Sequence, residues 1–379
     1  MNIATIHTLY GRRAGAELLF EKTVAGLLAR YPDVSFAIYC NEEADGALPA
    51  SESRMRKIVV PLLNGQIKKA FWLEFLARGV VEAGKPDLFW IPSGANSFPG
   101  PWNVPNVVTF LDLGEFFIRN KYDFKRTLYR RRICVPLSLR RAAVTTAISK
   151  HTAADLERCF PLRGRPRVVY PGPTPRHPAS PADDAPAVIR AETGRTFRRI
   201  IFSPGRTDYQ GKGRDLLLRA YADLVRRAGD APPLVMAGPR GEGHQKMEDD
   251  IRSLNLGDRV AWLGRVSDPC IDALYAVSAM MVLPSRYEGF GFPVLEAMEH
   301  DVPVVCSDAG SLPEVAGEAA LVFPSGNIEE LAAGMLRLLT EDGARRALIA
   351  EGARQVRKFS WDATFAGMYD AFAAAMGNP

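Results

Sequence analysis

Two glutamates flank a glycine-containing loop in the segment PSRYEGFGFPVLE, residues 284–296. Glu288 lies in the loop, and Glu296 lies just beyond it. The apolar run Met280–Leu283 predicts a buried strand before the loop, and Pro293 predicts the first turn of a helix after it. The N–H groups of a first helical turn bind anions with help from the helix dipole. This pattern indicates a ligand with phosphates in its middle and hydroxyl groups on both sides, such as a nucleotide-sugar.

Two cations stand in a second loop, SPGRTDYQGKG at residues 203–213, between a predicted strand and a predicted helix. Ligands bind at the carboxyl ends of strands in open α/β sheets, so Arg206 and Lys212 could neutralise a departing diphosphate. The five residues between Gly205 and Gly211 exclude the GxxxxGK[ST] loop of ATP-hydrolysing enzymes. A solvated loop is the alternative. We favour a functional role because both loops are expected in the same sheet.

Two weaker signals come from the first half of the chain. The loop LYGRRAGAE, residues 9–17, carries Gly11 and Gly15 but lacks the GxGxxG dinucleotide fingerprint. It is either a loop that approaches a phosphate or a tight turn between strand and helix. Asp112 comes directly after a predicted buried strand, where a carboxylate is costly without a partner. It could orient a hydroxyl group, transfer a proton, or cap a helix.

These residues must be positioned by short strands that alternate with helices, and such a pattern predicts parallel sheets built from βαβ units. The strands are too many for one typical sheet, so the sequence predicts an α/β protein with two doubly wound, Rossmann-like domains. The predicted strands are Ile3–Thr8, Ser35–Tyr39, Leu88–Ile91, Val107–Phe110, Ala143–Ile148, Val168–Tyr170, Ile200–Ser203, Leu234–Ala237, Val260–Leu263, Met280–Leu283, Val304–Cys306 and Ala320–Phe323.

A proline-dense segment, residues 171–186, separates the two domains, because such segments form semi-rigid linkers. We place the domains at residues 1–180 and 181–358. The last helical pattern, Phe359–Met376, has four large apolar residues on one face: Trp361, Phe365, Met368 and Phe372. Pattern alone favours packing of this helix on its own, second domain.

The composition is that of an ordinary globular protein, with 47% of the 379 residues hydrophobic and 24% charged. No apolar run approaches the roughly 18–20 residues of a membrane span, and the first residues predict a strand rather than a signal peptide. The five cysteines are scattered, which favours free thiols in the cytoplasm. The five histidines show no metal-ligand spacing, and a formal charge of +5 does not by itself indicate nucleic-acid binding.

The whole chain resembles the family 4 retaining glycosyltransferases of the GT-B fold. The N-terminal glycine loop, the Gly-Arg…Lys-Gly loop and the E-x7-E loop occur in that family's order, together with AISK at residues 147–150 and VYPGP at residues 169–173. The tract Tyr287–Pro313, with the sequence SLPEVAG, is most similar to the bacterial mannosyltransferase-like branch.

The resemblance implies a first, acceptor-side domain that faces a second, nucleotide-sugar-binding domain across a deep cleft. Residues 359–379 would cross back to the first domain, in place of the packing that pattern alone favours. Arg206 and Lys212 would bind the donor diphosphate. Glu288 would contact hydroxyl groups of the donor sugar, and Glu296 would accept hydrogen bonds from the ribose.

Further contacts implied by the resemblance involve the backbone. Gly15 would let the backbone of the first domain approach the phosphate. The segment of Gly291, Phe292, Pro293 and Val294 would lie near the donor and would offer it the backbone N–H groups that its non-proline residues carry. The expected catalytic set is Glu288, Asp112, Arg206 and Lys212. Neither a metal ion nor a cofactor is expected, because arginine, lysine and a helix dipole replace the metal.

Leu111 departs from the family pattern, which often has a histidine at this position in contact with the donor sugar. Either Asp112 makes that contact instead, or the donor sugar lacks a polar group there, as a deoxyhexose would. The departure bears on the identity of the donor more than on the class of reaction.

We therefore expect transfer of a mannose-like, glucose-like or deoxyhexose sugar, for example from GDP-mannose, to a glycan or lipid-linked acceptor in cell-surface polysaccharide or lipopolysaccharide synthesis. Glu288 and Glu296 would not flank one bond, so they are not a glycosidase pair. A GT-B sugar-nucleotide epimerase and a catalytically silent sugar-nucleotide-binding protein are the alternatives. The paired loops favour the transferase, and Leu111 keeps the silent binder open.

Two basic segments interleaved with aromatic residues bear on the acceptor side: KKAFWLEFLAR at residues 68–78 and KYDFKRTLYRRR at residues 121–132. Such segments can dock on an anionic membrane surface. A solvated helix face over a core stripe is the alternative. We expect peripheral contact with the inner face of the cytoplasmic membrane, and no nucleic-acid partner.

Overall fold

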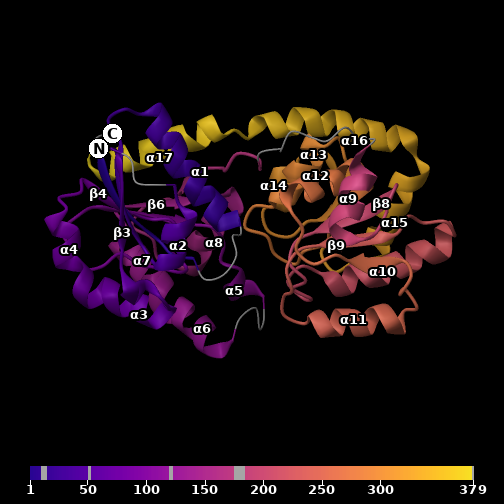
Figure 1. Ribbon diagram of the computed structural model, residues 1–379, viewed down its shortest axis with the longest axis horizontal. Helices are drawn as coiled ribbons and strands as arrows, with labels where there is room; N and C mark the ends of the chain where they lie inside the picture. The colour runs from indigo at the N-terminus through magenta and orange to yellow at the C-terminus, as the bar shows by residue number, and fades with distance from the viewer. Residues whose placement is uncertain (10–14, 50–52, 119–122, 175–183, 378–379) are drawn as a thin grey trace. The chain divides into compact units, whose positions relative to one another are not determined.

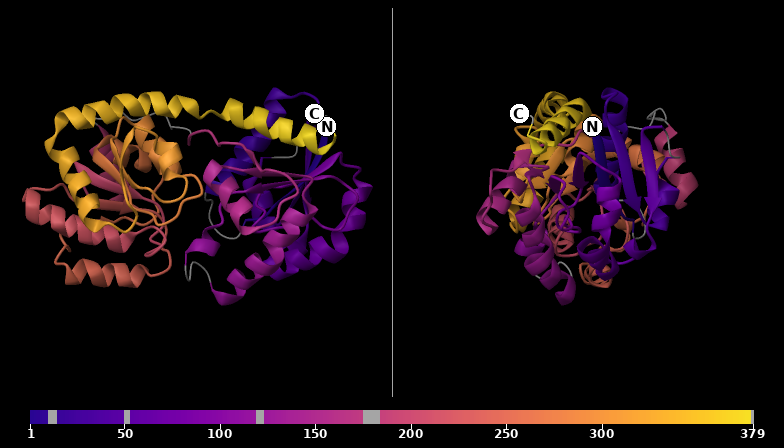
Figure 2. Two further views of the ribbon diagram at one scale, coloured as in Figure 1. Left: turned by 180° about the vertical axis from the view of Figure 1, so that it is seen from behind. Right: turned by 90° about the vertical axis from the view of Figure 1, so that its left-hand side faces the viewer.

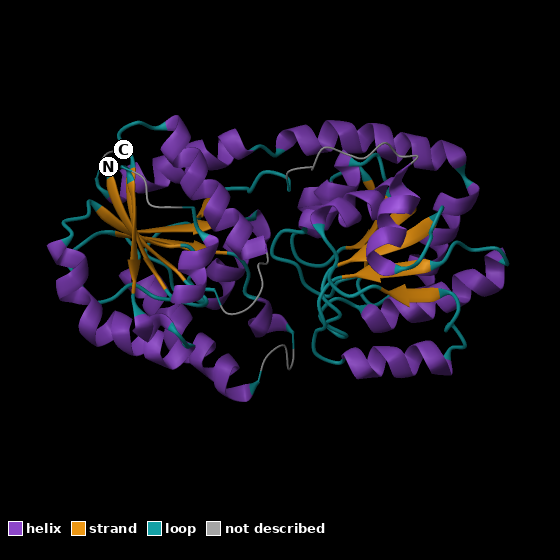
Figure 3. Cartoon of the chain, in the orientation of Figure 1, coloured by secondary structure: helices purple, strands orange, loops and turns teal. Residues whose placement is uncertain are grey.

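The computed structural model describes residues 1–9, 15–49, 53–118, 123–174 and 184–377 (Figure 1). The chain forms two compact units, Met1–Gly172 with Phe359–Pro379, and Pro173–Lys358. In each unit a parallel sheet carries helices on both faces (Figure 3). The predicted pair of Rossmann-like α/β domains is confirmed, and this is the architecture of the GT-B fold. The predicted cleft between the units stays a prediction.

The first unit has a seven-stranded sheet in the order β3-β2-β1-β4-β5-β6-β7. Its strands are β1 (Asn2–His7), β2 (Ser35–Cys40), β3 (Met55–Val59), β4 (Leu88–Ile91), β5 (Asn106–Phe110), β6 (Val144–Ala147) and β7 (Arg167–Val168). Its helices are α1 (Gly15–Arg30), α2 (Glu42–Ala47), η1 (Pro61–Leu63), α3 (Gln66–Phe71), η2 (Trp72–Leu76), α4 (Ala77–Ala83), α5 (Gly114–Phe117), α6 (Phe124–Tyr129), η3 (Arg130–Cys134), α7 (Val135–Arg141), α8 (Lys150–Cys159) and α17 (Trp361–Ala375). Of these, η1 is a 3₁₀ turn, and η2 and η3 are π-helical turns.

The second unit has a six-stranded sheet in the order β10-β9-β8-β11-β12-β13. Its strands are β8 (Ile200–Pro204), β9 (Leu234–Ala237), β10 (Val260–Trp262), β11 (Ser278–Leu283), β12 (Val304–Ser307) and β13 (Ala320–Phe323). Its helices are α9 (Ala185–Thr193), α10 (Arg214–Ala228), α11 (His244–Ser253), α12 (Asp268–Ala276), α13 (Phe292–Glu299), α14 (Leu312–Ala316), α15 (Ile328–Thr340), α16 (Asp342–Gln355) and the 3₁₀ turn η5 (Val356–Lys358).

Within the described residues, sequence patterns predicted every strand except β3. The central strands are easy to recognise because parallel strands are covered on both faces and read as continuous apolar runs. Strand β3 lies at the edge of its sheet and carries Arg56 and Lys57 in its middle. Charged residues on an edge strand discourage pairing with another chain, and they also hide the strand from a hydrophobicity pattern.

The units divide between Gly172 and Pro173, before the expected border at residues 180 and 181. The start of the linker is already tied to the second unit, because the Thr174 hydroxyl donates to the Glu296 carboxylate at 2.7 Å. Pro171 and Gly172 therefore belong to the first unit, and the second unit begins at Pro173.

Helix α17 belongs to the first unit, as the resemblance implied. The packing of this helix on the second domain, which the residue pattern alone favoured, is wrong. It lies beside α1 (Figure 2). The two helices approach so closely that a Cβ added to Gly26 would lie 2.0 Å from the ring of Phe365. Met368 and Phe372 are buried with strand residues of the first sheet, so α17 completes one of that sheet's two apolar cores.

Candidate functional site

The loops that follow β8 and β11 meet because these two strands are neighbours at the centre of the second sheet. The strand order reverses between them, with β9 and β10 on one side and β12 and β13 on the other. In open α/β sheets ligands bind beyond the carboxyl ends of the strands at this reversal. The two loops expected to share a site are therefore brought to the place where a doubly wound sheet binds its ligand.

The loop between β8 and α10 is shaped by two glycines with positive φ, Gly205 at 103° and Gly213 at 61°. A Cβ on Gly213 would lie 2.0 Å from the carbonyl oxygen of Pro284, so only glycine lets this loop approach the end of β11. Within the loop, an Asp208 carboxylate oxygen accepts from the Gly211 N–H at 3.0 Å. These contacts fix the backbone between Arg206 and Lys212.

Arg214, the first residue of α10, is fully buried and was missed in the sequence analysis. Its guanidinium donates to the Ser203 hydroxyl at 2.5 Å and to the carbonyls of Pro204, Gly205 and Arg206 at 3.0, 3.0 and 3.2 Å. Burial lowers the pKa of Arg214 to about 10, which leaves it charged at neutral pH. This arginine fixes the backbone from which the exposed Arg206 side chain projects.

Lys212 and Glu288 form an ion pair that joins the two loops, with Nζ 2.6 Å from Oε1. The same oxygen accepts from the Ser285 hydroxyl at 2.6 Å. The Glu288 side chain is 11% exposed and that of Lys212 is 29% exposed, so the pair is reachable from solvent. The carboxylate neutralises a cation in the place where the sequence analysis expects a diphosphate.

The backbone of Glu288 is held separately from its side chain. Its carbonyl accepts from both the N–H and the hydroxyl of Ser311, each at 3.1 Å. Gly310, with φ of 64°, passes so close that an added Cβ would lie 2.3 Å from the same carbonyl oxygen. The loop after β12 thus packs closely against the loop after β11 and fixes the backbone of Glu288.

A second ion pair joins the loop after β11 to the first turn of α10. Arg286 donates to both carboxylate oxygens of Asp215, at 2.7 and 2.6 Å. Its backbone N–H donates to the Gly211 carbonyl at 2.9 Å, and its guanidinium reaches the Gln210 carbonyl at 2.8 Å. The hydrogen bonds to Asp215 raise the pKa of Arg286 above its usual range. The sequence offered no local signal for this pair, because its partners are far apart along the chain.

Helix α13 begins where Pro293 predicted, with Pro293 in its first turn. Gly291 precedes it with φ of 98°, and an added Cβ would lie 2.6 Å from Leu312. The Val294 N–H donates to the Gly291 carbonyl at 2.9 Å, so this N–H is engaged within the turn. Phe292 and Pro293 are half-buried beside it.

Glu296 is already engaged in hydrogen bonds within its own unit. One of its carboxylate oxygens accepts from the Thr174 hydroxyl at 2.7 Å, and the other accepts from the Tyr275 hydroxyl at 2.9 Å. The pKa of the Glu296 carboxyl is raised because burial disfavours its charged form. Neither partner could be predicted from the sequence, because Tyr275 on α12 and Thr174 in the linker are brought to α13 only by the tertiary fold.

Asp112 and Gly15 lie in the first unit. The Asp112 carboxylate accepts from the N–H of Gly114, the first residue of α5, at 2.8 Å. Leu111 precedes it in the loop after β5. Gly15 is the exposed first residue of α1, whereas Gly11 of the same motif lies outside the described residues. A catalytic or donor-binding role of Asp112 and of Gly15 stays a prediction.

Two cations expected on the surface of the first unit are buried instead. Lys69 is 1% exposed and its Nζ is 3.4 Å from the Thr8 hydroxyl; burial lowers its pKa to about 8. Arg130 is 6% exposed and lies 3.3 Å from the carboxylate of Glu115, which is also buried. A hydrophobicity pattern treats lysine and arginine as surface residues, so it could not predict this cluster.

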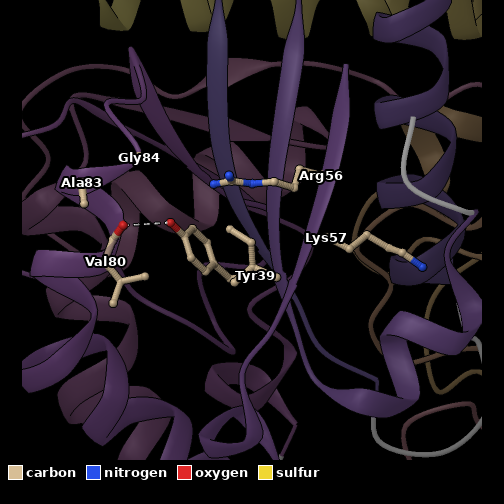
Figure 4. A pocket seen from close by; sticks show the side chains of 7 residues that line it. Tyr39, Arg56, Lys57, Val80, Ala83 and Gly84 are labelled. Carbon is tan, nitrogen blue, oxygen red and sulfur yellow. Dashed lines mark hydrogen bonds between the residues drawn. The ribbon is translucent and has the colours of Figure 1, made fainter. Parts of the chain in front are cut away.

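A shallow hollow in the first unit lies between β2, β3 and α4 (Figure 4). The Tyr39 hydroxyl donates to the Val80 carbonyl at 3.3 Å along one wall, and Arg56 and Lys57 line the side formed by β3. None of the predicted site residues lines this hollow. Elsewhere among the described residues, no three His, Cys, Asp or Glu side chains are grouped so as to hold a metal ion.

The sequences of curated relatives align with less than half of this chain. O-antigen chain mannosyltransferase B of Escherichia coli is 41% identical over 151 residues, which is 38% of each chain. The MMP alpha-(1->4)-mannosyltransferase of Mycolicibacterium hassiacum is 36% identical over 47% of this chain and 44% of its own. The lipopolysaccharide core biosynthesis mannosyltransferase LpcC of Rhizobium leguminosarum is 35% identical over 41% and 44%, respectively. The matches thus span less than half the length of these relatives.

Solved structures match the chain over its whole length but at low identity, and so they show the fold alone. A sucrose-phosphate synthase from Thermosynechococcus elongatus superposes with a TM-score of 0.75, at 21% identity and 100% coverage of both chains. HepE of Anabaena, in complex with UDP-glucose, gives a TM-score of 0.72 at 20% identity, with coverage of 99% and 100%. WaaG, a glycosyltransferase involved in lipopolysaccharide biosynthesis, gives 0.72 at 17% identity, with the same coverage.

Two family models match consecutive parts of the chain. Residues 13–175 match Glycosyltransferase Family 4, and residues 188–355 match Glycosyl transferases group 1. The two matches nearly coincide with the two units. Residues 203–213, which we call the cation loop, and residues 284–296, which we call the glutamate loop, both fall within the second match. The chain therefore belongs to the family 4 glycosyltransferases, with the GT-B fold and mannosyltransferases among its relatives.

Proposed function

We propose that this protein transfers a hexose from a nucleotide-diphosphate sugar to a glycan or lipid-linked acceptor, with retention at the anomeric carbon. The observation that carries the proposal is the meeting of Lys212 and Glu288, 2.6 Å apart, at the reversal point of the second sheet. Ligands are expected at that point in a doubly wound sheet, and a cation held there by a carboxylate can be taken over by a phosphate. Retention rests on the resemblance to retaining enzymes.

The chemistry follows from the charges in the two loops. When the bond from the anomeric carbon to the diphosphate breaks, negative charge grows on the leaving oxygen. Arg206 and Lys212 would stabilise that charge, and cations fixed in advance do so without reorganisation. Phosphate oxygens would replace Glu288 as the partners of Lys212, and the carboxylate would then accept from sugar hydroxyls. Asp112 is the proposed contact of the first unit with the sugar.

The ribose would be bound by Glu296, as the resemblance implies. Both of its carboxylate oxygens already accept from hydroxyl groups, those of Thr174 and Tyr275. A ribose hydroxyl presents the same donor chemistry, so it can take the place of the Thr174 hydroxyl, while Tyr275 continues to orient the carboxylate. Main-chain groups around Gly291 and the start of α13 would face the phosphates, with Gly15 approaching from the first unit.

Among donors, a mannose-like sugar such as that of GDP-mannose is our first choice, because three relatives are named mannosyltransferases. A glucose-like sugar is the next choice, since a solved structure of the same fold contains UDP-glucose. A deoxyhexose remains the third, because Leu111 offers no polar contact. The acceptor would belong to cell-surface polysaccharide or lipopolysaccharide synthesis at the inner face of the cytoplasmic membrane.

We also propose that no metal ion is needed, since Arg206, Lys212 and the start of α13 would meet the diphosphate charge. Turnover of the purified enzyme should be unchanged after treatment with EDTA and should not rise when magnesium or manganese is restored. A loss that the added metal reverses would show that this part of the proposal is wrong.

Two experiments separate the transferase from its rivals. In a thermal-shift screen against nucleotide-sugars, a donor that binds only the folded state raises the melting temperature. Incubation of that donor without acceptor should then release free sugar slowly, because an activated bond at a working site is open to water. A silent binder would release none, and an epimerase would convert the donor into a second nucleotide-sugar. Binding without any of these reactions would contradict the transferase.

A further inference from the structure

Exposed apolar side chains are concentrated in the first unit. Eight of them project from two helical segments, residues 66–83 and 124–134. They are Ile67 (87% exposed), Phe71 (50%), Phe75 (68%), Leu76 (47%), Val80 (49%), Phe124 (78%), Leu128 (47%) and Ile133 (47%). Single exposed apolar residues are ordinary on protein surfaces, but a group of this size marks a surface that is covered by something.

The first segment, α3–η2–α4, has two apolar faces rather than one. Trp72 and Leu73 are buried against the sheet and account for the core stripe that the sequence showed. Phe71 and Phe75 are not part of that stripe, and their rings lie beside each other in solvent, 5.1 Å apart. The solvent-exposed face that lies over the core stripe of this segment is therefore partly apolar.

Cations surround these apolar side chains. Lys68, Lys125, Arg126, Arg131 and Arg132 are all exposed on the same two segments. Two acidic side chains on the segments form ion pairs with arginines: Glu74 accepts two hydrogen bonds from Arg141, and Glu82 pairs with Arg78. Asp123 caps the start of α6 by accepting from the Arg126 N–H at 3.0 Å. The surface presented by the two segments is therefore both apolar and basic.

The two segments lie on the same side of the first unit. Figures 1 and 2 show α3 and α6 along one edge of it, in front and rear views. Burial is the main cause of the lowered pKa of Lys69 in α3, and the charges of Arg130 in η3 and Arg126 in α6 lower it further, which agrees with this placement. We call the exposed residues of 66–83 and 124–134 the basic-apolar face.

We propose that the basic-apolar face docks on the surface of an anionic lipid bilayer. Interfacial helices place aromatic and aliphatic residues among the headgroups while lysine and arginine attract anionic lipids, and this face offers both. A second copy of the chain is a poorer occupant, because like charges would be brought together. The inference goes beyond glycosyl transfer and does not depend on it, since docking requires neither donor nor acceptor.

The test is flotation of the purified full-length protein with vesicles of phosphatidylcholine alone and of equal parts phosphatidylcholine and phosphatidylglycerol. We expect binding to the anionic vesicles, weaker binding to the neutral ones, and loss of binding as salt is raised. The triple variant Lys68→Gln/Lys125→Gln/Arg132→Gln should bind anionic vesicles about a hundredfold more weakly, given what each cation contributes near a charged bilayer.

A matched control removes the same charge elsewhere. Arg195, Arg198 and Arg199 are exposed cations of the second unit, and their triple change to glutamine should leave binding unchanged. A third variant, Phe71→Ser/Phe75→Ser/Phe124→Ser, should lose binding while keeping its net charge. Unaltered melting curves would show that each variant is folded.

Three outcomes would overturn the proposal: no flotation of the wild type with either vesicle, an equal loss in both charge variants, or retained binding in the phenylalanine variant. Reversible dimerisation that the phenylalanine variant abolishes, without flotation of the wild type, would assign the face to a second copy instead. None of these results depends on catalytic activity, so failure here is distinct from failure of the proposed transferase.

Discussion

Lys212 and Glu288 form an ion pair that joins two loops, and this pair lets us predict how a substitution of Lys212 changes turnover. Replacing Lys212 by alanine removes a fixed cation from the proposed leaving group, so turnover should fall by roughly 10²–10³. The exposed Arg195 of the same unit offers a control, and its change to alanine should leave turnover unaltered. Steady-state kinetics with the best nucleotide-sugar measure both. Full turnover in the Lys212→Ala enzyme would remove the diphosphate role.

A substitution of Arg214 leads to a separate prediction, because we expect Arg214 to position Arg206 rather than to contact the substrate. Lysine at this position keeps the charge but cannot donate to Ser203 and three carbonyls at once. We expect the Arg214→Lys enzyme to stay folded and to lose roughly 10-fold or more in kcat through a misplaced Arg206. If Arg214 acts in this way, the double variant should lose little more kcat than Arg206→Ala loses alone.

A control for this cycle lies on the same helix. Arg219 is exposed on α10, and its change to lysine should leave kcat and KM as they are. Full additivity of Arg214→Lys and Arg206→Ala would show that the buried arginine serves only the stability of the unit.

At the scale of elements, α3 carries a buried cation whose cost can be measured. Below pH 8, Lys69 is charged in both the folded and the unfolded states. Burial of this charge raises the free energy of the folded state and therefore lowers the stability of the protein. Between a folded pKa of about 8 and the ordinary value of 10.5 the unfolded chain holds more protons, so stability rises with pH. Lys69→Met, which has no such penalty, should be more stable than wild type by about 1–3 kcal/mol at pH 7.

That advantage should shrink as pH approaches 10, where the folded wild type has already lost the proton from Lys69. Urea unfolding of both proteins at pH 7 and pH 10 measures the difference. The neighbouring Lys68 is exposed, so Lys68→Met should change stability by no more than about 0.5 kcal/mol at either pH. A gain that is the same at both pH values would not come from the charge of Lys69.

At the scale of the whole molecule, α17 joins the end of the chain to the first unit. Phe372 is fully buried and meets Trp90 edge to face, with ring centroids 5.7 Å apart. Phe372→Ala should therefore destabilise the first unit by about 3–5 kcal/mol. If the two units melt separately in calorimetry, only one transition should move, and a bound nucleotide-sugar should raise the other. A shift in the nucleotide-sensitive transition alone would contradict this placement.

Sequence alone determined the features that depend on local pattern. Buried parallel strands appear as apolar runs, and Pro293 marks a helix start because its φ is restricted. The cation loop and the glutamate loop were predicted from residue types and spacing. Strand β3 was not predicted, because it is an edge strand whose charged residues interrupt the apolar pattern.

Tertiary structure decided which distant residues meet. Lys212 reaches Glu288 only because β8 lies next to β11, and that order is set by packing of whole elements rather than by any periodicity along the chain. The burial of Arg214 and the attachment of Thr174 and Tyr275 to Glu296 arise in the same way. A linear pattern records which side chains avoid water, whereas the contacts between buried polar groups depend on three-dimensional neighbours that the pattern does not contain.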